Sequence, residues 1–137
     1  MFFDMVRTMT MSYSYKPVFI KSFLEHMNSN GEARLIDIVQ EFDEFYKERI
    51  ERGLEAEKKP CIFTRGGYTE NDVEKLILGM PFKRFEDMNF LQHSKYLGVI
   101  KVNPAISKRW TAEEIQSLRV FCDKALDKYF GSLQPQD

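Results

Sequence analysis

The spacing of apolar residues predicts that most of the chain is helical. Four residues after Pro17 recur at the i, i+3, i+4, i+7 interval of one helix face, and Pro17 itself suits a first helical turn. This pattern predicts a helix over residues 17–28. After a short extended piece at residues 32–35, a second apolar stripe predicts a helix that ends at Gly53. The two stripes are Ile20, Phe23, Leu24 and Met27, and Ile38, Val39, Phe42 and Phe45.

Residues 54–68 contain few apolar positions, and this pattern predicts a long connection between helices. The run 61–63 is its only apolar interruption, and it predicts one short strand that turns inward. Thr69 and Asp72 then form a capping-box pattern, which begins a third helix that ends at Gly79. Pro81 can open a short fourth helix.

The pattern changes from helical to β-like after this short helix. Residues 90–93 and 99–102 are rich in β-prone side chains, and the five residues between them include a glycine, which fits a hairpin loop. A turn at residues 103–110 follows. Thr111 and Glu114 form a second capping box, and the last helix that it begins continues to Phe130.

Length and composition favour one compact domain. The chain has 137 residues, 43% of them hydrophobic, and its 12 Phe, 6 Tyr and 7 Met can fill a core. We predict a flexible leader over residues 1–13, a single domain over residues 14–131 and a polar tail over residues 132–137. No apolar run approaches the roughly 20 residues of a membrane span, and no signal-peptide pattern begins the chain, so we expect a cytoplasmic protein with no membrane contact.

The two cysteines do not suggest a metal or redox site. Cys61 and Cys122 are far apart in the sequence and lack the close CxxC spacing of such sites. Free cysteines suit a reducing compartment and are usually packing residues. We predict no cofactor.

The order of elements predicts an α+β, mainly helical fold that resembles a winged helix. A helical core precedes one β-hairpin, which corresponds to the wing, and a C-terminal helix follows. The connection between the second and third helices is longer than the tight turn of a helix-turn-helix, which weakens a direct transfer of groove-reading roles. A winged-helix core also serves as a docking or dimerisation module, so the fold alone does not decide function.

Three segments also resemble a known module. Tyr15–Val18, Phe42–Arg49 and Met80–Asp87 are similar to a small module at the C-terminal end of bacterial restriction-type helicases and related defence proteins. The resemblance covers residues 14–130. It implies an accessory role, with a helicase or nuclease as partner protein. The chain contains no GxxxxGK[ST] motif, so this route to nucleotide hydrolysis is not expected here.

Basic charge is concentrated in the middle of the chain. The net charge is -3 over residues 1–56, +4 over residues 57–109 and -2 over residues 110–137. A nucleic-acid-binding winged helix places phosphate contacts in the middle segment, so we predict contacts with DNA or RNA phosphates; a merely solvated surface is the alternative. The predicted contact residues are Lys75, Lys83, Arg84, Lys95, Tyr96, Lys101, Lys108 and Arg109. Tyr96 either stacks on a base or packs back on its own hairpin.

An acidic run on the second helix gives a competing hypothesis. Such a run usually forms a solvated helix face, and the same face could dock a basic partner. The alternative function is therefore a protein-interaction or dimerisation module that uses this face and binds no nucleic acid; exposed aromatic residues near the N-terminus could serve the same purpose. The run consists of Glu41, Asp43, Glu44, Glu48, Glu51 and Glu55.

Catalytic patterns are weak. Residues 57–59 read Glu-Lys-Lys and fit the E-x-K string of restriction-type nucleases, in which the carboxylate holds Mg²⁺ and the lysine helps to activate water. That chemistry needs a strand beside a second strand-borne acid, whereas this string lies in a charged connection. His26 and His93 have no neighbours at metal-ligand spacing. We predict a non-catalytic protein without a metal site, and a metal-dependent nuclease is a distant alternative.

Overall fold

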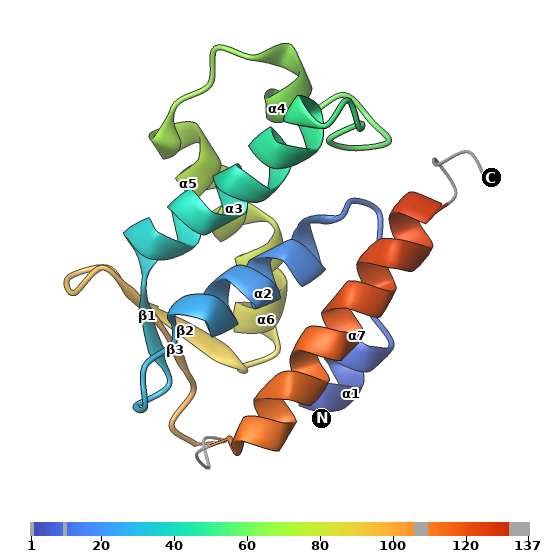
Figure 1. The fold of residues 1–137 in the computed structure, drawn as a ribbon. Coiled ribbons are helices and arrows are strands. Elements are labelled where there is room, and N and C mark those ends of the chain that lie inside the picture. The colour runs from blue at the N-terminus through green and yellow to red at the C-terminus, as the bar shows by residue number, and fades with distance from the viewer. Residues whose placement is uncertain (1, 10, 106–109, 132–137) are drawn as a thin grey trace.

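The computed structural model describes residues 2–9, 11–105 and 110–131. The fold is α+β and mainly helical, with one β-hairpin and a C-terminal helix, as the sequence predicts (Figure 1). The helices are α1 (Phe2–Arg7), α2 (Tyr15–His26), α3 (Leu35–Glu51), α4 (Ile62–Arg65), α5 (Glu70–Gly79), α6 (Pro81–Asp87) and α7 (Ala112–Gly131). The strands are β1 (Glu32–Arg34), β2 (Leu91–Ser94) and β3 (Val99–Val102).

Helix α2 occupies the centre of the molecule. It contacts α3, α6, α7 and β1, which surround it on several sides (Figure 1). Phe19, Ile20 and Phe23 are completely buried. A helix enclosed in this way has apolar side chains around much of its circumference and not along one narrow stripe.

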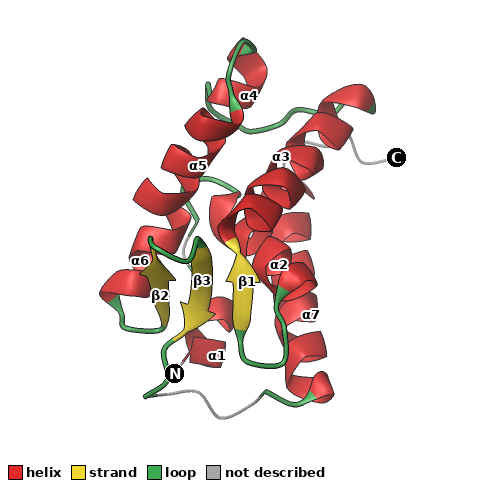
Figure 2. Cartoon of the chain, turned by 90° about the vertical axis from the view of Figure 1, so that its left-hand side faces the viewer, coloured by secondary structure: helices red, strands yellow, loops and turns green. Residues whose placement is uncertain are grey.

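The three strands form a small antiparallel sheet in the order β1-β3-β2 (Figure 2). The extended piece predicted at residues 32–35 is β1, and it pairs with β3 so that Ala33 lies opposite Ile100. Leu91 of β2 lies opposite Val102 of β3. All four side chains are buried, so one face of the sheet covers the core. Along the chain the core runs α2, β1, α3, α4, α5, α6, β2 and β3, which is a winged-helix-like order with the short helices α4 and α6 added.

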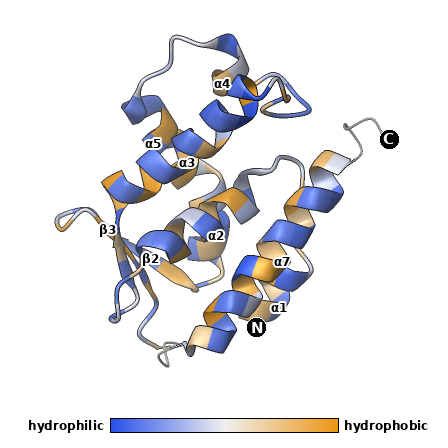
Figure 3. Ribbon diagram, viewed as in Figure 1, coloured by the Kyte–Doolittle hydropathy of each residue, from blue (hydrophilic) through white to orange (hydrophobic). Residues whose placement is uncertain are grey.

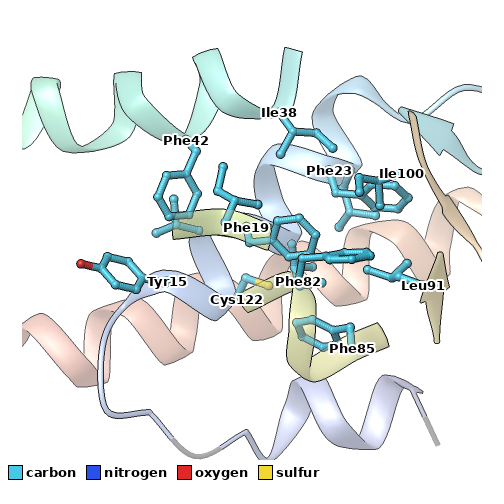
Figure 4. Close-up of a cluster of buried hydrophobic side chains, with 14 of the residues drawn as sticks. Tyr15, Phe19, Phe23, Ile38, Phe42, Phe82, Phe85, Leu91, Ile100 and Cys122 are labelled. Atoms are coloured by element: carbon cyan, nitrogen blue, oxygen red, sulfur yellow. The ribbon is translucent and has the colours of Figure 1, made fainter. Parts of the chain in front are cut away.

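Aromatic side chains from α2 and α6 meet beneath the sheet. The Phe19 ring lies 6.2 Å from the Phe82 ring and 6.0 Å from the Phe85 ring, measured between centroids (Figure 4). Pro81 is at the first helical position of α6, where its missing N–H costs no hydrogen bond. This start places both phenylalanines of α6 against α2, and α6 thereby connects the helical core to the hairpin.

Helix α7 begins where the capping-box pattern predicts. The Glu114 backbone N–H donates to Thr111 Oγ1 at 3.1 Å, and the Thr111 backbone N–H donates to Glu114 Oε1 at 2.9 Å. Apolar residues recur at helical spacing between polar ones along α7 (Figure 3), and the helix packs on α2. Among the described helices, including this longest one, none has the length and apolarity to cross a membrane.

The apolar run at residues 61–63 forms part of a helix and not a strand. Cys61 is the N-cap of α4, and its backbone N–H donates to Thr64 Oγ1 at 3.1 Å. The Phe63 ring stacks on Tyr46 of α3 with 4.3 Å between centroids. A single helical turn is too short to show a 3.6-residue period, so the sequence pattern could not distinguish it from a strand.

Helix α1 lies where the sequence predicts a flexible leader. Phe2 and Val6 are buried, and α1 packs on α7. The Phe2 ring stacks on Trp110 with 5.2 Å between centroids and 2° between planes, and it also contacts Phe85. These partners are distant in sequence, so the two turns of α1 are held by tertiary contacts that no local pattern reveals.

The buried thiol of Cys122 gives a prediction about reactivity. Cys122 is fully buried, and burial raises the pKa of its thiol to about 12. We expect iodoacetamide at pH 8 to leave Cys122 unmodified in the native protein and to modify it in guanidinium chloride. The folded state disfavours the thiolate. The free energy of unfolding therefore falls as the pH rises from the ordinary thiol pKa towards 12. Mass spectrometry of tryptic peptides measures the modification, and equal rates in the native and unfolded protein would contradict this burial.

Candidate nucleic-acid interface

Helices α5 and α6 and the β2–β3 hairpin lie along one side of the molecule (Figure 2). This side, which we call the α5–α6–hairpin side, carries most of the predicted contact residues. Lys101 is half-buried on β3, whereas Lys108 and Arg109 lie outside the described residues. The exposed predicted residues are Lys75 on α5, Lys83 and Arg84 on α6, and Lys95 and Tyr96 in the hairpin loop.

Tyr96 projects from the tip of the hairpin and does not pack back on it. Its exposed fraction is 97%, and the adjacent Leu97 is 66% exposed. Gly98 closes the loop at a φ of 66°, a backbone conformation that favours glycine, and its carbonyl accepts a 2.8 Å hydrogen bond from the Leu35 N–H. The tip is therefore anchored to the start of α3 while the Tyr96 ring is free to stack on a base.

Lys83 is engaged by acidic neighbours on its own helix. Its Nζ lies 2.7 Å from Asp87 Oδ1 and 3.7 Å from Glu86 Oε1. The hydrogen bond to Asp87 and the negative charges of both carboxylates raise the pKa of Lys83. These exposed pairs stabilise the helix only slightly, but they offset the positive charge that the sequence assigns to this position.

A pocket between the N-terminal end of α2 and the start of α6 collects further basic residues. We call this space, of about 390 Å³, the α2–α6 pocket. It brings Arg84 and Lys83 next to Lys16, which does not stand out in the sequence because it lies in the acidic first segment. The pocket is lined by Ser12, Tyr13, Tyr15, Lys16, Gly79, Met80, Pro81, Lys83 and Arg84.

The two cations Lys16 and Arg84 influence each other across this pocket. Burial lowers the pKa of Lys16, and the positive charge of Arg84 lowers it further. Holding like charges close together costs stability, and a bound anion would relieve that cost. Tyr13 stacks on Tyr15 with 4.9 Å between centroids, so one wall of the pocket is flat and aromatic. The pocket thus combines positive charge with an aromatic surface.

Lys101 and α5 fit a nucleic-acid interface less well. Lys101 lies opposite Glu32 in the sheet and shares a second pocket, of about 430 Å³, with Glu86. The first turn of α5 carries Glu70 and Asp72, at the helix end that a helix-turn-helix inserts into the major groove. Acidic side chains there repel phosphate, which disfavours groove reading by this helix.

The acidic run on α3 is only partly a solvated face. Asp43 is buried, contrary to the expectation for this run, and it accepts a 2.6 Å hydrogen bond from the Tyr68 hydroxyl. Lys47 pairs with Asp43 at 2.9 Å, and Arg52 pairs with Glu48 at 3.3 Å. The remaining exposed acids present a smaller charged surface for docking than the sequence alone predicts.

Glu57, the acid of the E-x-K string, is buried in a hydrogen-bond network. Its Oε2 accepts from the Ser14 backbone N–H at 2.8 Å and from Ser14 Oγ at 2.7 Å. Its Oε1 accepts from the Lys58 backbone N–H at 2.8 Å and from the Tyr129 hydroxyl. Ser14 Oγ also lies 2.7 Å from the Tyr46 hydroxyl, so the network joins the 54–61 connection to α2, α3 and α7.

This setting differs from the one that nuclease chemistry requires. Glu57 lies in a connection between α3 and α4 and not on a strand, and its two oxygens already accept four hydrogen bonds. Within residues 2–9, 11–105 and 110–131, no three His, Cys, Asp or Glu residues are grouped to hold a metal ion. The geometry around Glu57 is that of a structural cross-link between segments.

Comparison with known proteins adds no further evidence. No protein-family model, no curated protein and no solved structure matches the chain.

Proposed function

We propose that the protein binds nucleic acid, without catalysing a reaction on it, through the α5–α6–hairpin side and the adjoining α2–α6 pocket. The observation that carries this proposal is the convergence of Lys16 and Arg84, from distant parts of the chain, on one pocket. A phosphate group in the pocket would be attracted by both charges. Arginine can present two parallel N–H donors to phosphate oxygens, and lysine adds a compact positive charge.

Contacts of this type read the backbone and not the base sequence. Phosphate contacts set position and affinity, and they make the affinity depend steeply on salt. The acidic first turn of α5 is consistent with this mode, because base reading through the major groove would bring Glu70 and Asp72 close to phosphates. We expect little sequence preference, on either DNA or RNA.

Tyr96 extends the proposed surface beyond the pocket. Its ring is 97% exposed and adjoins Lys95, so a base can stack on it while the lysine contacts a neighbouring phosphate. Helix α6 connects the two parts, because its first residues line the α2–α6 pocket and its body contacts β2. Such a ring can stack on a base of a single strand, or on a base unstacked from a duplex, more readily than on a base inside an intact duplex.

Replacing Tyr96 with alanine tests the role of the hairpin. We expect Tyr96→Ala to weaken single-stranded oligonucleotide binding by about 1–3 kcal/mol, which is the contribution of one base stacked on an aromatic ring. Tyr96→Phe retains the ring and should bind like the original protein. Fluorescence anisotropy measures the affinity, and thermal unfolding should be unchanged because the side chain makes few contacts. Equal affinities of the alanine and phenylalanine variants would remove Tyr96 from the interface.

An accessory role beside a helicase or nuclease is the second part of the proposal. It is supported by the resemblance of Tyr15–Val18, Phe42–Arg49 and Met80–Asp87 to the C-terminal module of restriction-type helicases. In that setting, the module would hold nucleic acid close to a catalytic partner. The competing function, a docking module that uses the acidic face of α3, predicts no oligonucleotide binding even at low salt.

A further inference from the structure

A second basic pocket has a lining that shares no residue with the α2–α6 pocket. It is formed by the C-terminal half of α7 together with the end of α1 and the residues that follow it, and its volume is about 600 Å³. We call it the α1–α7 groove. Neither half of this groove stands out in the sequence, because residues 1–13 read as a flexible leader and α7 lies in a segment of net negative charge.

The lining of the groove is positively charged. Arg7, Lys58, Lys124 and Lys128 line it, and the described lining residues include no acidic side chain. Arg7 pairs with Asp4 at 3.2 Å, and Lys58 Nζ lies 4.3 Å from the centre of the Tyr129 ring. Lys124 and Lys128 are one helical turn apart, an arrangement of like charges that destabilises a helix slightly. The three lysines therefore give the groove an excess of positive charge.

The floor of the groove is apolar. Met9, Met11 and Phe121 line it, and each is packed on the core while keeping part of its surface accessible. Methionine side chains are flexible and polarisable, so they adapt to apolar groups of different shape. An apolar floor bounded by cations matches a ligand with an apolar stripe and acidic flanks.

We propose that the α1–α7 groove binds an acidic amphipathic helix of a partner protein. Charge complementarity selects the acidic flanks, and the Met9–Met11–Phe121 floor selects apolar anchors at i, i+3 and i+4 spacing. The α7 lining residues from Phe121 to Lys128 span about two helical turns, which is enough for two or three anchors. Nucleic acid fits this floor less well, because Phe121 is its one aromatic ring and the two flexible methionines do not extend the flat stacking surface that bases need.

Peptide binding to the full-length chain tests this assignment. The probes are two sets of fluorescein-labelled helical peptides of about 14 residues with the same leucine stripe, whose other positions are all glutamate in one set and all lysine in the other. We expect micromolar binding of acidic peptides only. Lys124→Glu with Lys128→Glu should weaken binding at least about tenfold, and Met11→Ser should weaken it about fivefold.

A charge-matched control separates this groove from the nucleic-acid interface. Lys75→Glu with Lys95→Glu changes the net charge equally on the α5–α6–hairpin side and should leave peptide affinity unchanged. Lys124→Ala with Lys128→Ala, which removes charge without reversing it, should give an intermediate loss, and circular dichroism monitors folding of every variant.

Three results would overturn the assignment. The first is that the acidic peptides do not bind, and the second is that the groove and control variants weaken peptide binding equally. The third is that the Lys124→Glu, Lys128→Glu variant loses oligonucleotide binding but still binds the peptide. The last result would assign the groove to nucleic acid. Oligonucleotide binding measured in the same proteins reports separately on the proposed nucleic-acid interface, so failure of one proposal is distinguishable from failure of the other.

Discussion

Replacing Glu57 with glutamine is expected to lower the free energy of unfolding by about 3 kcal/mol. The two carboxylate oxygens of Glu57 accept hydrogen bonds from the Ser14 N–H and hydroxyl, the Lys58 N–H and the Tyr129 hydroxyl. A glutamine side chain replaces one acceptor oxygen with an NH₂ group, which then faces donors. Whichever oxygen is replaced, a backbone N–H of Ser14 or Lys58 faces the new NH₂ group and loses its acceptor, and leaving a buried polar group unpaired is costly.

Urea unfolding monitored by circular dichroism measures this effect. Glu55→Gln is the matched control, because Glu55 is exposed two residues earlier in the same connection, and we expect its change to stay within about 0.5 kcal/mol. Equal, small changes for the two variants would contradict the cross-linking role assigned to Glu57.

Reversing two charges in the α2–α6 pocket is expected to have the largest effect on binding. We expect Lys16→Glu with Arg84→Glu to weaken oligonucleotide affinity at least about 100-fold at low salt, and to reduce the slope of log affinity against log salt by about two. Each substitution removes one phosphate contact and places a carboxylate where a phosphate would bind. The loss should be similar for different base sequences, because the pocket contacts phosphates.

The control for this variant must change the net charge equally at another site. Arg52→Glu with Arg65→Glu meets this condition, because both residues are exposed, one at the end of α3 and the other on α4. We expect a loss below about threefold, from the general change in charge alone. Equal losses in the two variants would show that the α2–α6 pocket has no special part in binding.

Local signals in the sequence predicted most of the fold. Thr69 and Thr111 begin helices through reciprocal capping hydrogen bonds, and both caps depend only on residues three positions apart. The strands of the hairpin likewise follow from β-prone runs and a loop that contains Gly98. Such signals act over a few residues, so they can be read without knowledge of the tertiary structure.

Elements that depend on distant partners were not predictable in the same way. Helix α1 is held by contacts of Phe2 with Trp110 and Phe85, and α4 is held by stacking of Phe63 on Tyr46. Both helices have at most two turns, so neither shows a readable period. Tertiary packing therefore determines the structure of α1 and α4, where the local sequence pattern gives no prediction of a helix.

The candidate site was predicted in part. Counting charge by segment found Arg84 and Lys95 but not Lys16, because folding brings Lys16 to α6 from a segment of net negative charge. The partial neutralisation of Lys83 was readable, since Asp87 follows it at the i+4 position of a helix. The burial of Glu57 was not readable, because its partners Ser14 and Tyr129 are distant in sequence.

The most direct test of nucleic-acid binding is a fluorescence-anisotropy titration of the purified protein. Labelled single-stranded and double-stranded oligonucleotides are titrated at two salt concentrations, because phosphate contacts give a linear dependence of log affinity on log salt. The proposed function predicts micromolar or tighter binding that weakens steeply as salt increases. An absence of binding to both oligonucleotides at low salt would contradict it and would favour a protein partner.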